Sequence, residues 1–429
     1  MSKSRFYDVI VLGGGPAGLG CAMQMAEHGI STLVLEKDAI GTTKKTWLSF
    51  DESLKKYGLE SCACNRFSNI VFSSYLGGKY SFTNTNFLRP LDENKALCCL
   101  ADKAGHNGAD IHGKERFASY AVENASETIV TTNKRKYRTR LVVDAMGRES
   151  TILQSLGLSH APLDMGCLAY RLDNVKHTED NTLLLYDSFY PGSDYFWMVP
   201  LSGESVMVGV FFFSSLTDTN MEEKSRKLKQ YIRDKKLGGK KTDTRMGNIP
   251  LGNQVHCCAE PFLFFGDSSN TPLPSSGFSF HRCLEESEIL GRFAVEYLDN
   301  NKQLKDFKKE ILGPKIPGLE IHLLISEMLS KFTDPMLNKA VSAMNHLDEK
   351  FLISFLSGND MSVTFSMKAV MAILNIFSMS EIRSLSLKQN YVKSLMNFYN
   401  LIPSVSPTKL GEQVKDFVLG IWNNRGEIG

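Results

Sequence analysis

The sequence lacks both a membrane-length apolar segment and a basic block. Its longest apolar run, residues 363–379, is interrupted by Lys368 and is short for a bilayer crossing. The 49 basic residues nearly balance the 47 acidic ones, which leaves a net charge of +2 and no electrostatic footprint for nucleic acid. We therefore expect no nucleic-acid partner. A helix that lies on a membrane surface is a hypothesis, and with it peripheral membrane contact.

The nine cysteines show no metal-ligand pattern. They contain no CxxC pair, and no histidines stand at zinc spacing, so we expect no metal site. An odd number of unpatterned cysteines is typical of small buried hydrophobes in a reducing compartment. The first apolar strand begins by residue 7, which leaves no room for a cleavable leader before it. The sequence therefore predicts a cytoplasmic protein. The alternative is a cytoplasmic protein that contacts a membrane peripherally.

The start of the chain carries the strongest motif. Residues 7–12 (YDVIVL) form a pattern typical of a buried strand, and a glycine turn, a helix-length segment and a second strand follow. This order predicts the βαβ unit that binds the ADP half of a dinucleotide. Gly13 permits the tight turn, and Gly15 lets backbone N–H groups approach the pyrophosphate. Gly18 lets the helix pack closely on the strand.

An acid at the end of the second strand completes this unit. Glu36 stands where a carboxylate can accept hydrogen bonds from both ribose hydroxyls. Ala17 in the turn and Lys37 beside the acid are further cofactor-binding candidates.

Two internal segments extend the predicted cofactor site. Residues 140–150 (RLVVDAMGRES) read as an apolar strand that ends at Asp144 and is followed by a tight turn. Arg89 and Pro90 precede a predicted helix over residues 92–105, which would place the guanidinium beside the cofactor. A surface cap is the alternative interpretation of Arg89.

A third segment predicts a second grip on the same cofactor. Residues 261–287 read as a buried strand that ends in Gly266 and Asp267, then a proline-rich loop and a helix starting near Gly277. We expect Asp267 to hold a ribityl or pyrophosphate segment. Free N–H groups around Gly277 and Phe278 would face an electron-rich ring edge, which a reduced flavin presents.

These motifs, in this order, resemble a known superfamily. The run GGGPAG, LVLEK, RP before a helix, VVDAMGR and GDSS…SSGF is similar to the FAD-dependent proteins of the p-hydroxybenzoate hydroxylase fold. That superfamily includes aromatic hydroxylases, geranylgeranyl reductases, lycopene cyclases and flavin halogenases, and the resemblance covers residues 5–300. It implies FAD as cofactor and an α/β fold: a Rossmann-type FAD domain, an inserted antiparallel substrate sheet (α+β in character) and a helical C-terminal tail.

One stretch resembles the prenyl reductases within that superfamily. The segment PGSDYFWMVPLSGESVMVGV looks like their Y-x-W-x-F-P motif followed by G-x-G, with Tyr195, Trp197 and Gly209 matching. Val199 replaces the usual aromatic residue, and Phe211 replaces the last glycine. Tyr195 and Trp197 share one face of a strand because they are two residues apart, and we take them as catalytic candidates above the isoalloxazine. Ordinary aromatic core residues are the alternative.

Other stretches resemble lycopene cyclases. They are residues 45–60, 249–252 and 274–286, together with the helical tail after residue 300. Those cyclases carry paired glutamates where this chain reads VMVGVFFFSS, so the acid that protonates the olefin is missing. Flavin halogenases fit poorly, because neither their W-x-W-x-x-I-P segment nor an obvious lysine for a chloramine is found.

The sequence thus predicts an FAD-dependent oxidoreductase that reduces carbon–carbon double bonds of an apolar, isoprenoid substrate by hydride from flavin N5. A lycopene-type cyclase, a biosynthetic monooxygenase and a non-catalytic flavin redox sensor are the alternatives. No second glycine fingerprint is present, so NAD(P)H without its own Rossmann unit, or a separate donor, supplies the electrons.

A chain of 429 residues exceeds what one hydrophobic core usually supports. The predicted parts are an FAD-binding domain of residues 1–65, 88–158 and 255–300, a substrate sheet of residues 66–87 and 159–254, and a helical C-terminal region of residues 301–429.

Overall fold

The computed structural model describes residues 5–124, 126–158, 163–175, 181–192, 194–252 and 257–385. Residues 386–429 of the predicted C-terminal region lie outside the described residues, as do 159–162 and 253–256 near the ends of the predicted substrate sheet.

The first sheet is built around the predicted βαβ unit, which the structure confirms. Strand β1 pairs in parallel with β2 on one side and with β10 on the other, and β10 pairs in parallel with β17. These central strands are almost continuously buried, as expected for strands covered on both faces. The eight strands are β1 (Arg5–Leu12), β2 (Thr32–Leu35), β7 (Asp110–His112), β8 (Phe117–Asn124), β9 (Glu127–Thr132), β10 (Lys136–Asp144), β16 (Cys258–Ala259) and β17 (Phe262–Phe264).

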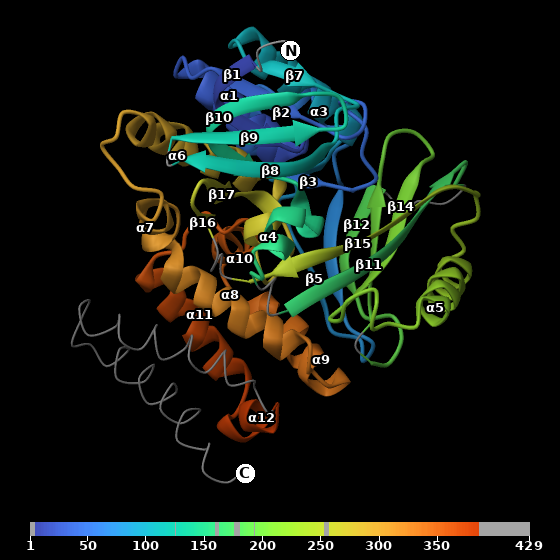
Figure 1. The fold of residues 1–429 in the computed structure, drawn as a ribbon. Coiled ribbons are helices and arrows are strands. Elements are labelled where there is room, and N and C mark those ends of the chain that lie inside the picture. The colour runs from blue at the N-terminus through green and yellow to red at the C-terminus, as the bar shows by residue number, and fades with distance from the viewer. Residues whose placement is uncertain are drawn as a thin grey trace, which may run out of the picture.

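Three helices share one apolar core on this sheet (Figure 1). They are α1 (Pro16–Glu27), α3 (Glu93–His106) and α6 (Phe280–Leu298). Helix α3 matches the helix predicted after Arg89, and the side chain of Asp92 caps it by accepting the Lys95 N–H at 3.0 Å. Short elements beside them are β3 (Leu48–Phe50), α2 (Asp51–Lys56), β6 (Leu88–Pro90) and α4 (Thr151–Ser155).

Among the described residues, the second sheet has seven strands in the order β15-β11-β14-β13-β12-β4-β5. All neighbours are antiparallel except β12 and β4. Helix α5 (Met221–Asp234) covers one face through Leu228 and Tyr231, and the other face belongs to a separate apolar cluster shared with the C-terminal helices. The strands are β4 (Asn69–Ser73), β5 (Lys79–Ser81), β11 (Leu163–Asp173), β12 (Thr182–Asp187), β13 (Tyr195–Pro200), β14 (Val206–Phe212) and β15 (Lys240–Leu251).

The C-terminal helices pack beneath both sheets (Figure 1). Asn338 fixes them to the hairpin of β4 and β5, because its side-chain oxygen accepts the Gly78 N–H and the Ser74 hydroxyl, both at 2.7 Å. Among the described residues, no helix combines the length and the hydrophobicity that a bilayer crossing needs. The helices are α7 (Asp306–Leu312), α8 (Ile316–Leu329), α9 (Asp334–Ala343), α10 (Glu349–Ser357), α11 (Val363–Ile376) and α12 (Met379–Ser384).

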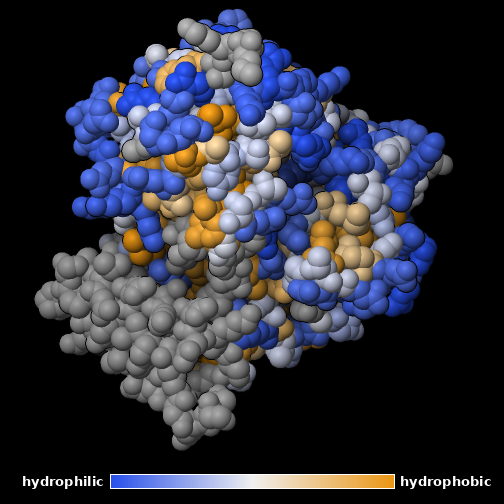
Figure 2. All heavy atoms as spheres, viewed as in Figure 1, coloured by the Kyte–Doolittle hydropathy of each residue, from blue (hydrophilic) through white to orange (hydrophobic). Residues whose placement is uncertain are grey.

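Hydrophilic side chains cover most of the described surface in the view of Figure 2, and apolar areas interrupt them. Since the strands of the second sheet come from residues 69–81 and 163–251, we propose the same three-part division of the chain that the motifs suggest.

Candidate functional site

The glycine turn before α1 is shaped to receive a phosphate. Gly13 has a φ of +110°, and a Cβ on it would lie 2.4 Å from the Ala145 carbonyl oxygen. A Cβ on Gly18 would collide with the Gly13 carbonyl, whereas no atom lies within 4 Å of the position a Cβ would take on Gly15. Gly15 is the N-cap of α1 and no side chain caps the helix. The turn therefore directs uncapped N–H groups at open space, which fits a pyrophosphate.

Glu36 lies directly beside this turn. Its Oε2 accepts the Gly14 N–H at 2.6 Å and its Oε1 accepts the Asp38 N–H at 2.8 Å. These two bonds fix the carboxylate at the end of β2, where it fits a ribose. Lys37 is half exposed and lies 3.8 Å from the Asp38 carboxylate, so the structure places its side chain at the surface.

Asp144 holds the turn after β10. Its carboxylate accepts the Met146 N–H at 3.0 Å and the hydroxyl of Ser150, and burial raises its pKa to about 6. Beyond this turn, Arg148 forms an ion pair with Asp164 of β11 at 2.9 Å, which links the two sheets.

The Gly266–Asp267 turn meets the first glycine turn. A Cβ on Gly266 would lie 2.6 Å from the Cβ of Ala17, so the two turns touch although they are about 250 residues apart in the sequence. The Asp267 carboxylate forms an ion pair with the ammonium group of Lys45 at 2.5 Å. Residues far apart in the chain thus converge at the carboxyl edge of one parallel sheet, which is where such sheets bind ligands.

The prediction of a free N–H at Gly277 is wrong. This N–H donates to the Leu273 carbonyl at 2.7 Å, because the loop closes a tight turn in which Gly277 has a φ of +73°. The Phe278 N–H lies 3.5 Å from the Ser276 hydroxyl. Helix α6 begins at Phe280, and its N-cap Ser279 makes no side-chain capping bond. The uncapped helix end therefore lies two or three residues later than expected.

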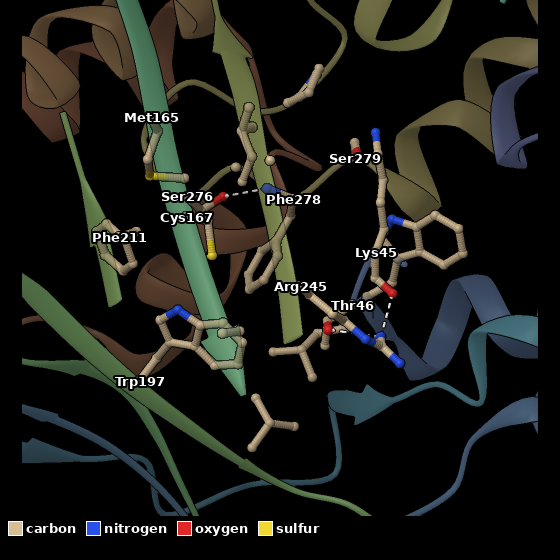
Figure 3. A pocket seen from close by; sticks show the side chains of 18 of the residues that line it. Lys45, Thr46, Met165, Cys167, Trp197, Phe211, Arg245, Ser276, Phe278 and Ser279 are labelled. Carbon is tan, nitrogen blue, oxygen red and sulfur yellow. Dashed lines mark hydrogen bonds between the residues drawn. The ribbon is translucent and has the colours of Figure 1, made fainter. Parts of the chain in front are cut away.

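A cavity of about 200 Å³ separates this loop from the second sheet (Figure 3). Its floor consists of residues of β11 to β15, among them Cys167, Trp197 and Phe211. Its opposite side consists of the segment from Lys44 to Leu48 and of the loop of residues 268–279, called the flavin loop below, including Phe278 and Ser279. Most of the lining is apolar, so the cavity suits a hydrocarbon group beside the cofactor.

Trp197 and Tyr195 share the predicted face of β13 but have different surroundings. Trp197 lines the cavity and lies flat over Gly209 of β14, where a Cβ would be 2.3 Å from the indole ring. Tyr195 is only 1% exposed, and its hydroxyl donates to the Leu329 carbonyl at 2.8 Å. Its ring stacks on Phe211 with centroids 5.4 Å apart. Trp197 therefore contacts the cavity directly, and Tyr195 supports the wall behind it.

Arg89 is not a surface cap, since it is 9% exposed. Its Nε donates to the Asn65 carbonyl at 2.6 Å, and its Nη1 donates to Asp51 at 3.2 Å. It is not part of the cavity lining.

The motifs missed three cationic residues at the cavity, Lys44, Lys45 and Arg245. Arg245 of β15 donates through Nη1 to the Lys45 carbonyl at 2.5 Å, to Thr46 Oγ1 at 3.0 Å and to Glu93 Oε1 at 2.8 Å. Both Arg245 and Lys45 line the cavity. Arg245 also forms an ion pair with the nearby Asp243 at 3.1 Å. Nothing in the local sequence signals its role at the cavity, because Glu93, Thr46 and Lys45 lie 152 to 200 residues away.

His281 lies near the start of α6 and makes a structural contact. It is fully buried, its Nε2 bonds the Ser357 carbonyl at 2.7 Å, and burial lowers its pKa to about 4. In the part of the chain that the structure describes, no group of three or more histidine, cysteine or acidic side chains is arranged to hold a metal ion.

The fold and the site together define the class of protein. The open glycine turn, the carboxylate after β2 and the Gly-Asp turn after β17 fit the ADP and ribityl parts of FAD, and the cavity fits beside its ring. The chain has the fold of FAD-dependent flavoproteins, and the residues at its site fit that cofactor. It is similar in fold to a geranylgeranyl bacteriochlorophyll reductase-like protein from Thermoplasma acidophilum (TM-score 0.75, 20% identity, 92% of this chain and 100% of that one). It is also similar to a flavin-dependent brominase (TM-score 0.66, 14% identity, 86% and 98%).

Sequence comparison gives the family. The model of the lycopene cyclase protein family matches residues 8–384, and the chain belongs to that family. It is also similar to digeranylgeranylglycerophospholipid reductase 2 of Methanopyrus kandleri, with 24% identity over 371 residues, 80% of this chain and 91% of the relative. The reductase and cyclase resemblances drawn from the motifs are both confirmed.

Proposed function

We propose that this protein uses FAD to reduce carbon–carbon double bonds of an isoprenoid lipid. One observation carries the choice of reduction over cyclisation. Among the described residues that line the cavity, Asp267 is the only carboxylate, and Lys45 pairs with it. A cyclase needs an acid that can protonate an olefin, and the apolar floor of this cavity offers no carboxylic acid for that step.

Each part of the site receives a role in this proposal. The turn that binds the pyrophosphate is shaped by Gly13, Gly15 and Gly18. Glu36 accepts hydrogen bonds from the ribose hydroxyls. Asp267 accepts a hydrogen bond from a hydroxyl of the ribityl chain, and this hydroxyl competes with Lys45 for the carboxylate. Reduced FAD would supply both a hydride and a proton when it is bound, so the two hydrogens that the double bond gains need no acid from the protein.

The remaining candidates support this arrangement. Asp144 and Gly266 belong to the two turns that would flank the cofactor, and the uncapped N-terminus of α6 would face its ring edge. Phe278 and Trp197 line the cavity from opposite sides, where they exclude water and position an apolar chain.

The substrate class rests on the cavity and on the relatives. The lining offers mainly aliphatic and aromatic contacts, and a relative that spans most of this chain is named as a reductase of a digeranylgeranyl lipid. We propose that the substrate comes from a membrane by peripheral contact, and that NAD(P)H or a separate donor reduces the flavin. Binding to liposomes, measured by sedimentation, tests the membrane contact.

Anaerobic photoreduction tests the reaction. The reduced protein is mixed, without oxygen, with a geranylgeranyl lipid, and the return of the oxidised flavin spectrum is followed. We expect reoxidation by the lipid alone. A monooxygenase would require oxygen as well, a cyclase would convert the lipid and leave the flavin reduced, and a redox sensor would do neither.

Cyclisation is the second candidate, because the family model is that of lycopene cyclases. A cyclic product of unchanged mass would establish it.

A further inference from the structure

Along the floor of the cavity, the exposure of the residues falls from one side of the sheet to the other. One row across the sheet consists of Gly247 of β15, Cys167 of β11, Phe211 of β14 and Tyr195 of β13, each opposite the next. Gly247 and Cys167 are partly exposed, Phe211 is 7% exposed and Tyr195 is 1% exposed. The row thus runs from the open edge of the sheet into its closed interior.

The open end of this row lies at the edge strand. No atom lies within 4 Å of the position that a Cβ would take on Gly247, so the space above this residue is free. The adjacent Met246 is 61% exposed and also lines the cavity. An apolar chain can therefore cross β15 over Gly247 without displacing any side chain there.

The closed end is a rigid aromatic wall. The ring of Phe211 stacks on Tyr195 and meets the edge of Tyr186 at a centroid distance of 4.9 Å. Both tyrosines are anchored, since Tyr195 donates to the Leu329 carbonyl of α8 and Tyr186 donates to the Ser275 carbonyl of the flavin loop at 2.9 Å. Phe211 stands where the related motif has a glycine, and its ring fills space that a glycine would leave open.

We propose that Phe211 determines the length of the apolar chain that this cavity accepts. The chain enters over Gly247, passes Cys167 and ends against the Phe211 ring. This assignment rests on the proposed function, because it concerns the substrate of the same site, and it adds the residue that selects among prenyl chains.

The test uses binding of prenyl alcohols to the FAD-loaded protein. Two of the three tryptophans, Trp47 and Trp197, line the cavity, so a W422F background reports on this site by tryptophan fluorescence. Dissociation constants are measured for geraniol, farnesol and geranylgeraniol. We expect Phe211→Ala to improve the affinity for the longest alcohol relative to the shortest by about tenfold, because the additional isoprene unit is buried.

Phe212→Ala is the matched control. Phe212 is the neighbouring residue, is 3% exposed and packs on the opposite face of the sheet, so its replacement removes an equally buried ring and leaves the cavity unchanged. An equal change of length preference in both variants would overturn the proposal. Phe211→Leu, a smaller change, should shift the preference in the same direction and covers the case in which Phe211→Ala does not fold.

Gly247→Leu tests the route. It should weaken binding of all three alcohols, and unaltered binding would contradict passage over Gly247.

The outcomes also separate this inference from the proposed function. Unchanged length preference with intact flavin reoxidation by a geranylgeranyl lipid rejects the role of Phe211 alone, and no binding of any alcohol rejects both.

Discussion

At the residue scale, two carboxylates hold opposite parts of the proposed FAD site in different surroundings. Glu36 is fixed by two backbone N–H groups, whereas Asp267 is paired with the ammonium group of Lys45, whose side chain is 55% exposed. A cofactor hydroxyl can replace the lysine at Asp267, while Glu36 can accept further hydrogen bonds without losing the ones it has.

The first prediction concerns Glu36. Replacing it by glutamine keeps the shape and removes the charge, and a hydrogen bond to a charged group contributes about 1.5–3 kcal/mol. We expect the FAD dissociation constant of Glu36→Gln to rise about ten- to hundredfold, measured by fluorescence quenching during titration of the apoprotein. Lys37→Ala is the control on the adjacent exposed residue. Equal dissociation constants for Glu36→Gln and the unmodified protein would remove Glu36 from the site.

The second prediction concerns Tyr195. Tyr195→Phe removes the hydrogen bond to Leu329 and keeps the ring, so we expect a loss of about 1 kcal/mol in the free energy of unfolding with unchanged FAD content. Urea unfolding measures it. Tyr190→Phe is the comparison, since its hydroxyl bonds Asp234 at the exposed surface and its loss should cost less. A Tyr195→Phe protein that is fully stable but inactive would restore Tyr195 to a catalytic role.

At the element scale, buried polar contacts join the C-terminal helices to the flavin loop and to the start of α6. His322 of α8 bonds Ser275 at 2.6 Å, and His281 of α6 bonds the Ser357 carbonyl of α10 at 2.7 Å. Both imidazoles are fully buried, and burial lowers the pKa of His281 to about 4 and that of His322 to about 3. The loop that holds Asp267 is therefore stabilised by two histidines that must stay neutral.

The third prediction follows from these pKa values. An exposed histidine in the unfolded chain has a pKa of 6.5, so the unfolded chain takes up protons before the folded protein as the pH falls. Stability should therefore decrease between about pH 6.5 and pH 4, by up to about 3 kcal/mol for His281 alone. Urea unfolding at several pH values measures the decrease.

Variants assign this pH dependence. His281→Gln or His322→Gln should flatten the curve over that range, and His346→Gln, at an exposed position, should not. A curve that stays equally steep in both buried variants would show that other groups cause the acid sensitivity.

The same elements show what the sequence could and could not predict. The unit of β1, α1 and β2 was predictable because strand period, glycine positions and the terminal acid are all local features. The Gly266–Asp267 turn was predictable for the same reason. The sequence could not predict that the Gly277 N–H is occupied, because the start of α6 depends on a turn that the Leu273 carbonyl closes. The contact of Arg245 with Glu93 and the anchor of Tyr195 on Leu329 could not be predicted either, since these partners lie more than 130 residues away in the sequence.

At the scale of the whole molecule, ion pairs join the second sheet to the part of the chain that forms the first sheet. Arg245 connects β15 to the first residue of α3, Glu93, and also holds the carbonyl of Lys45 across the cavity. Glu93 is 9% exposed, and burial raises its pKa even though Arg245 opposes that shift. The pair thus lies in surroundings where an unpartnered charge is costly.

The fourth prediction is a coupling between these two residues. Arg245→Ala should destabilise the protein by about 3 kcal/mol because it leaves Glu93 without its cation. The double variant with Glu93→Ala should recover part of this loss, which gives a coupling free energy of about 1 kcal/mol or more in a double-mutant cycle. The free energies come from urea unfolding of the four proteins. Additive losses would mean that the pair does not join the two parts energetically.

The measurement closest to the central claim is the mass of the product of a single anaerobic turnover in heavy water. The N5 hydrogen of a reduced flavin exchanges with solvent, so a geranylgeranyl lipid reduced by this protein should gain two deuterium atoms for each double bond that is lost. A lipid that keeps its degree of unsaturation, or cyclises with the flavin still reduced, would contradict the assignment of this protein as a double-bond reductase.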